Sequence, residues 1–130
     1  MTSRLFFLVV LAVLAFPACG DKARDSLLGS WGGQWASSGG ATGDVQTNFT
    51  DDDGRRFDGT IQFSGSPCFS GAAITGELIG DDMSGTITAG AVEIAYSATL
   101  DDTVMSGSYT AVTAGVCTGD VGTFSLEKRD

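Results

Sequence analysis

The chain has 130 residues, with 16 acidic against 7 basic side chains, a net charge of −9 and no histidine. A surface this acidic repels phosphate groups, which excludes nucleic acid as a partner. Without histidine there are no Ser-His or Cys-His catalytic pairs and few routes to a zinc or iron site, so we expect neither an enzyme nor a cofactor.

The first 18 residues have the pattern of a signal peptide. Arg4 supplies a positive charge, and an unbroken apolar run of twelve residues extends from Leu5 to Phe16. Twelve residues are too few to span about 30 Å of hydrocarbon as a helix, but they suit the apolar region of a signal peptide. We therefore expect the protein to be exported.

The residues that follow this run resemble the lipobox of bacterial lipoproteins, which reads Phe16-Pro17-Ala18-Cys19 in this chain. In that family the cysteine becomes the lipid-modified N-terminus, and a small residue such as Ala18 precedes it. Phe16 and Pro17 depart from the commonest pattern. The resemblance implies lipidation at Cys19 and a membrane-anchored protein of the cell envelope. Gly20 stands where Asp would favour the inner membrane, so the outer membrane, facing the periplasm or the cell surface, is favoured in a cell with two.

The cysteine count supports lipidation. Three cysteines are an odd number for an oxidising compartment, but lipidation of Cys19 leaves Cys68 and Cys117 as a pair, which predicts a disulfide. Residues 19–28 then form the lipidated N-terminus and a short tether. The short, mostly polar segment of seven residues at 20–26 extends at most about 25 Å, which keeps a single domain of residues 29–130 close to its membrane.

Apolar and polar residues alternate through most of residues 29–130, as in Val45, Thr47 and Phe49, and Gly, Asp and Ser clusters separate the alternating runs. Alternation with a period of two is typical of antiparallel strands with one buried face, and the breaks are too short for crossover helices. The sequence therefore predicts eight strands, at residues 30–37, 43–50, 56–64, 70–79, 83–88, 91–100, 104–112 and 119–127.

The pattern apolar-x-Gly-x-apolar recurs at residues 57–61, 74–78, 83–87 and 105–109. A glycine on the apolar face lets a strand bend sharply and leaves space for a large neighbour, as a tightly curved sheet requires. We predict an all-β fold, an eight-stranded antiparallel up-and-down meander that closes into a small barrel. A two-sheet β-sandwich is the alternative.

Gly29-Ser30-Trp31 at the first strand resembles the Gly-x-Trp motif of the calycins, the group of lipocalins, avidins and related barrels. In those proteins the tryptophan packs under a basic residue near the end of the last strand, a role that the resemblance gives to Lys128 or Arg129. The resemblance implies a calycin-like barrel and, as one function, carriage of a small apolar ligand.

Alternate turns of a meander fall at the same end of the barrel. Cys68 and Cys117 fall together at one end, as a disulfide requires, and both termini fall at the other. The second end also collects seven turn aspartates, Asp51, Asp52, Asp53, Asp81, Asp82, Asp101 and Asp102. Asp51-Asp52-Asp53-Gly54 faintly resembles a calcium loop but lacks its ligand spacing and terminal Glu, so plain hairpin turns are preferred. No metal site is predicted, and Asp51 and Asp53 are the calcium candidates.

Three non-enzymatic functions remain: an interaction module for a protein or glycan, a carrier of a small apolar ligand, and an inhibitor of a secreted protease. The aromatic side chains are enough to fill a small barrel, which favours the interaction module, and we expect a monomer. Its contact surface is assigned to the loops at the cysteine end, residues 38–42, 65–69 and 113–118, with Phe69 and Val116 as contacts. An opposing interpretation is that these loops are only turns.

Overall fold

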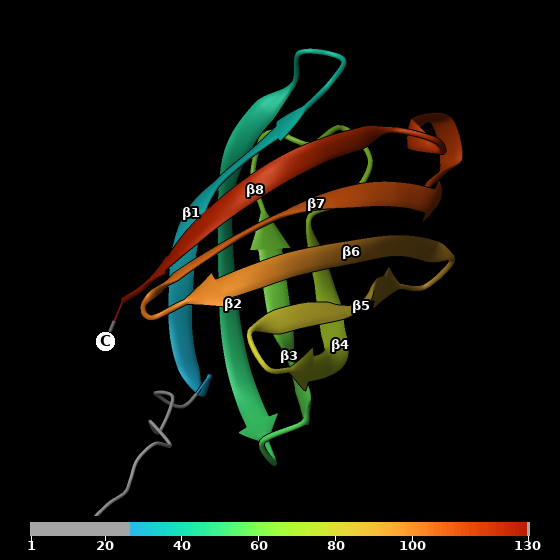
Figure 1. Ribbon diagram of the computed structural model, residues 1–130. Coiled ribbons are helices and arrows are strands. Elements are labelled where there is room, and N and C mark those ends of the chain that lie inside the picture. The colour runs from blue at the N-terminus through green and yellow to red at the C-terminus, as the bar shows by residue number, and fades with distance from the viewer. Residues whose placement is uncertain (1–26, 130) are drawn as a thin grey trace, which may run out of the picture.

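Eight antiparallel strands follow one another round a closed barrel in the computed structural model, which describes residues 27–129 (Figure 1). Each strand pairs with its sequence neighbours, and the last pairs with the first. This confirms the predicted barrel and excludes the sandwich. The strands are β1 (Gly29–Ser37), β2 (Thr42–Asp52), β3 (Arg56–Phe63), β4 (Gly71–Ile79), β5 (Asp82–Ala89), β6 (Val92–Asp101), β7 (Val104–Thr113) and β8 (Val121–Lys128).

The predicted signal peptide, Cys19 and most of the tether lie outside the described residues. Within residues 27–129 the only helical element is a 3-10 turn, η1 (Gly115–Cys117), between β7 and β8. Over the same residues, no helix has the length and apolar character needed to cross a membrane.

The strand boundaries match the predicted ones to within two residues, and two departures have a local cause. β2 continues to Asp52 because a bulge after Phe49 lets it stay paired: Phe49 lies opposite Gly59, whereas Asp51 lies opposite Asp58. β8 begins only at Val121 because residues 118–120 are tied into the preceding loop by backbone hydrogen bonds.

Inward-facing side chains fill the barrel, and the predicted alternation places them there. The fully buried members include Trp31 and Phe49, and Phe57 packs edge-on against Phe49 with ring centroids 5.4 Å apart. One of the motif glycines makes room for such a ring. Gly76 pairs with Gly85, and a Cβ on Gly76 would lie 2.7 Å from the Phe57 ring. Glycine is therefore required at this close approach of strand and ring.

The segment before β1 is part of the core. Leu27 is 0 % exposed, its backbone N–H donates to Asp52 Oδ2 at 3.1 Å, and its carbonyl accepts the Trp31 Nε1 proton at 2.9 Å. Lys128 Nζ lies 5.7 Å from the centre of the Trp31 ring, which is the packing that the calycin resemblance implies. The fold therefore includes Leu27, ahead of the domain start placed at residue 29.

Thr47 is the buried polar exception in the described barrel. It is 0 % exposed on the inner face of β2, and its Oγ1 has no hydrogen-bond partner there. Because an unpaired buried hydroxyl is destabilising, Thr47→Val should raise the free energy of unfolding by about 1 kcal/mol, measured by urea denaturation. The same change at the exposed Thr99 should stay within about 0.5 kcal/mol. A loss of stability in Thr47→Val would mean that the hydroxyl has a partner.

Candidate functional site

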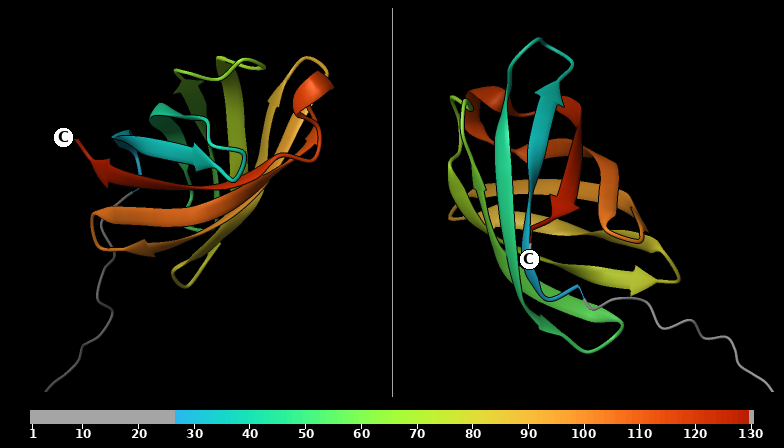
Figure 2. Two further views of the ribbon diagram at one scale, coloured as in Figure 1. Left: turned by 90° about the horizontal axis from the view of Figure 1, so that it is seen from above. Right: turned by 90° about the vertical axis from the view of Figure 1, so that its left-hand side faces the viewer.

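The strand order divides the connections between two ends of the barrel (Figures 1 and 2). We name the end with the β2–β3, β4–β5 and β6–β7 turns the acidic end; the residues next to both termini lie there too. The other, the disulfide end, carries the four remaining connections. The seven predicted aspartates lie at the acidic end, as do all the basic residues between 27 and 129: Arg55, Arg56, Lys128 and Arg129. The disulfide end therefore carries no cation within the described residues.

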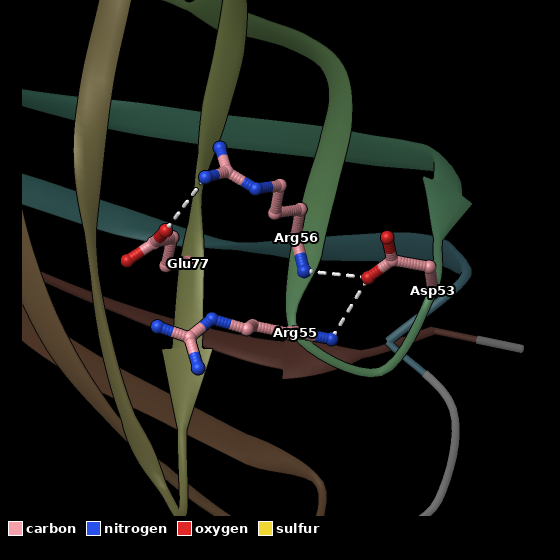
Figure 3. A network of polar contacts seen from close by, with 4 residues as sticks. All are labelled: Asp53, Arg55, Arg56 and Glu77. Atoms are coloured by element: carbon pink, nitrogen blue, oxygen red, sulfur yellow. Dashed lines mark hydrogen bonds and ion pairs between the residues drawn. The ribbon is translucent and has the colours of Figure 1, made fainter.

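At the acidic end the carboxylate of Asp53 holds the β2–β3 turn (Figure 3). Its Oδ1 accepts the backbone N–H of Arg56 at 2.7 Å and that of Arg55 at 3.0 Å, and these hydrogen bonds hold the pKa of Asp53 below its ordinary value. Arg56 also pairs with Glu77 across β3 and β4 at 3.2 Å. No three Asp, Glu or Cys side chains in residues 27–129 gather as a metal site. Turn geometry accounts for the position of the Asp53 carboxylate.

The disulfide end takes its name from Cys68 and Cys117, which the structure pairs with Cα atoms 6.2 Å apart and 49 residues of separation, as predicted. Cys68 lies in the β3–β4 connection and Cys117 in the β7–β8 connection. Around a closed ring of eight strands these two connections are four strands apart in either direction. The disulfide therefore bridges opposite sides of the barrel mouth.

An apolar cavity of about 30 Å³ lies in the barrel interior, toward the disulfide end. Sites for drug-sized ligands usually measure about 300–1,000 Å³, so side chains fill this interior, as the sequence predicts. The lining has no charged residue, and it consists of Trp35, Val45, Ile61, Phe63, Phe69, Ile74, Ile87, Ile94, Tyr96, Met105, Tyr109, Phe124 and Leu126.

Partly buried aromatic rings close this cavity at the mouth. Phe69 follows Cys68 and packs edge-on against Phe63, with ring centroids 5.0 Å apart. Phe124 on β8 makes a similar contact with Tyr96 at 6.4 Å. Phe69, one of the two predicted contact residues, is thus turned toward the core and is not a free surface side chain.

A cluster of polar side chains links β1, β7 and the β7–β8 connection at the disulfide end. Asp120 accepts hydrogen bonds from the hydroxyl groups of Ser37 and, at 3.1 Å, Tyr109. Burial and then the charge of Asp120 raise the pKa of Tyr109 to about 12, so its hydroxyl remains a donor at neutral pH. Because Ser37 and Asp120 are 83 residues apart, no local pattern in the sequence pointed to this cluster.

The other predicted contact residue is fully presented. Val116, in η1 beside Cys117, is 97 % exposed, and Val112 and Val121 on the flanking strands are also exposed. A single exposed valine is ordinary, but these three lie on one disulfide-linked connection and the strands beside it, and we name them the apolar rim. Ser66 has a structural role, because its Oγ accepts the N–H groups of Cys68 and Phe69.

No family model and no curated protein matches the chain. Among solved structures it is similar to a redesigned β-barrel, at 22% identity and a TM-score of 0.62 over 80% of this chain and 92% of that one. It is also similar to the redesigned barrel mFAP1 bound to DFHBI, at 20% identity and a TM-score of 0.62, covering 78% and 94%. The third similar structure, EF1p2_mFAP2b bound to DFHBI, has 17% identity and a TM-score of 0.58, covering 79% of this chain and 94% of that one. These similarities show the fold, a small eight-stranded barrel consistent with a calycin-like one.

Proposed function

We propose that the protein is a membrane-anchored lipoprotein of the cell envelope whose barrel is a non-enzymatic binding module. The apolar rim at the disulfide end, with Val116 97 % exposed, is the observation that carries the proposal. The distribution of charge supports it, since the seven turn aspartates outnumber the four cations at the acidic end, and that end lies beside the residues that lead back to Cys19. Anionic lipid would repel that end and leave the disulfide end facing a partner.

The anchor is tested at Cys19. We expect Cys19→Ala to accumulate as an uncleaved or misprocessed precursor, because the lipid-modified cysteine is what the lipoprotein pathway recognises. The wild-type protein should instead partition into detergent, and the intact mass of its mature chain should include acyl groups. A mature wild-type chain that begins at Cys19 and carries no acyl mass would contradict the proposal.

The proposal that the disulfide end binds the partner is tested by capturing partners from the native envelope. Val116→Asp should reduce capture at least tenfold, because it places an unpaired charge in an apolar contact. Ile79→Asp is the matched control, since Ile79 is an exposed apolar residue, at 59 %, near the acidic end. Ala114 is buried, so a bulky side chain there would test folding instead. If Ile79→Asp reduces capture and Val116→Asp does not, the partner binds at the acidic end.

A second candidate function is carriage of a small apolar ligand. The observation in its favour is the lining of the interior cavity, which offers aromatic and aliphatic surface without a charged group. Two of the similar redesigned barrels are bound to DFHBI, which supports this function by analogy of fold only. At about 30 Å³ the cavity must enlarge before such a ligand can enter, so the mouth has to open.

A further inference from the structure

We propose that the Cys68–Cys117 disulfide is a reducible gate, and that its reduction admits a small, uncharged apolar molecule to the barrel interior. The inference rests on the carrier function above and adds a means of controlling it. It starts from the topology. The disulfide joins connections on opposite sides of the ring of strands, so the β3–β4 and β7–β8 connections meet across the mouth of the barrel.

Within residues 27–129 the disulfide is the sole bond that joins the β3–β4 connection directly to the β7–β8 connection. On the β3–β4 side, the backbone N–H of Phe63 donates to Ser70 and that of Ser64 donates to Asp44 on β2. The Ser64 carbonyl also accepts the indole N–H of Trp35 on β1 at 3.0 Å, so residue 64 stays tied while residues 65–69 beyond it are held by the disulfide. The hydrogen bonds of the β7–β8 connection stay within that connection and its own strands, apart from the Ser37–Asp120 contact to β1. No hydrogen bond or ion pair in that part of the chain joins the two connections, so breaking the disulfide separates them.

Separation of the two connections would open the interior cavity because of the position of Phe69. It is the residue next to Cys68, its ring lines the cavity, and its main packing partner at the mouth is Phe63, which lines the cavity too. Once Cys68 is released, the β3–β4 connection can move outward and take Phe69 with it. The space that this ring vacates adds to the present cavity. The ligand class follows from the lining, where an uncharged molecule needs no polar partner.

The chemical step is thiol–disulfide exchange with a dithiol reductant. One thiolate of the dithiol attacks a sulfur of the Cys68–Cys117 bond and forms a mixed disulfide, and its second thiol then displaces the protein sulfur. The protein gains two electrons and two protons and ends with two thiols, while the dithiol becomes a disulfide. The strand pairing and the side-chain contacts of Asp120 with Ser37 and Tyr109 involve neither cysteine, so the barrel itself stays closed.

The test uses the mature, detergent-solubilised protein and N-phenyl-1-naphthylamine, a small uncharged aromatic probe, followed by energy transfer from tryptophan. Trp35 lines the cavity, so a probe bound inside accepts energy from it, and the Val45→Phe variant described below separates this signal from transfer to probe in the detergent. Reduction by dithiothreitol should lower the Kd at least tenfold, with near-UV circular dichroism confirming that the barrel persists. Phe69→Ala, with its disulfide intact, should bind the probe without reduction.

Val45→Phe is the matched control, because it fills the cavity from β2 and leaves Phe69 and the disulfide unchanged. It should suppress binding in both redox states, and binding that survives it would place the probe outside the cavity and overturn the gate. Equal binding to oxidised and reduced wild type would overturn the gate and leave the carrier function standing. Absence of binding in every arm, Phe69→Ala included, would overturn both.

Discussion

Replacing Cys68 and Cys117 together by serine is expected to lower the free energy of unfolding by about 4 kcal/mol. The disulfide closes a loop of 49 residues, and its loss gives the unfolded chain the conformations that this loop forbids. A domain of this size is stable by about 5–15 kcal/mol, so the variant should fold but tolerate much less urea. Urea titration followed by tryptophan fluorescence measures the difference.

Reduction supplies the control for this prediction. Wild-type protein in excess dithiothreitol should unfold at the same urea concentration as the double-serine variant, and the variant should not respond to the reductant. The slope of free energy against urea should be steeper without the disulfide, because an uncrosslinked unfolded chain exposes more surface. A change below about 1 kcal/mol in both comparisons would show that the unfolded chain is already compact around these cysteines.

The architecture was predictable because a barrel of this kind is specified by local patterns. Alternation along each strand decides which face is buried, and short glycine- and aspartate-rich breaks leave no path except to the neighbouring strand. Counting those breaks placed Cys68 and Cys117 at one end, and the structure pairs them. The Gly76–Gly85 pair shows how far local signals reach: both glycines were flagged by a repeat, and both prove to be sites where no Cβ fits.

The details of the mouth were not predictable, because they depend on residues that meet only in three dimensions. Phe69 was expected at the surface from its place in a loop, but packing against Phe63 turns it inward. Nothing in the sequence distinguishes Asp120 from the other acidic residues, of which there are sixteen in all. Only the fold places it beside Ser37 and Tyr109. The cavity volume depends on how rings from several strands interlock, which alternation does not specify.

The burial of Leu27 was not predictable for a similar reason. Leu27 and Leu28 precede the first alternating run, so the sequence gives no sign that one of them is buried. The structure separates them: Leu27 is 0 % exposed, whereas Leu28 is 42 % exposed. Trp31 explains the difference, because its indole N–H binds the Leu27 carbonyl and draws that residue into the acidic end of the barrel.

Leu27→Ala is therefore expected to lower the free energy of unfolding by about 2–4 kcal/mol, through the loss of a fully buried side chain and the cavity left in its place. Both hydrogen bonds of Leu27 use its backbone, with Asp52 and Trp31, so the substitution removes packing and keeps polar contacts. Urea denaturation measures the effect, and Leu28→Ala is the matched control, expected within about 0.5–1 kcal/mol because that side chain is far more exposed. Amide exchange should also quicken at residue 27, since weaker packing lets this segment detach from the barrel before global unfolding. Equal losses of stability in the two variants would contradict this prediction. They would show that Leu27 contributes no more to the core than the exposed Leu28, despite its hydrogen bond with Trp31.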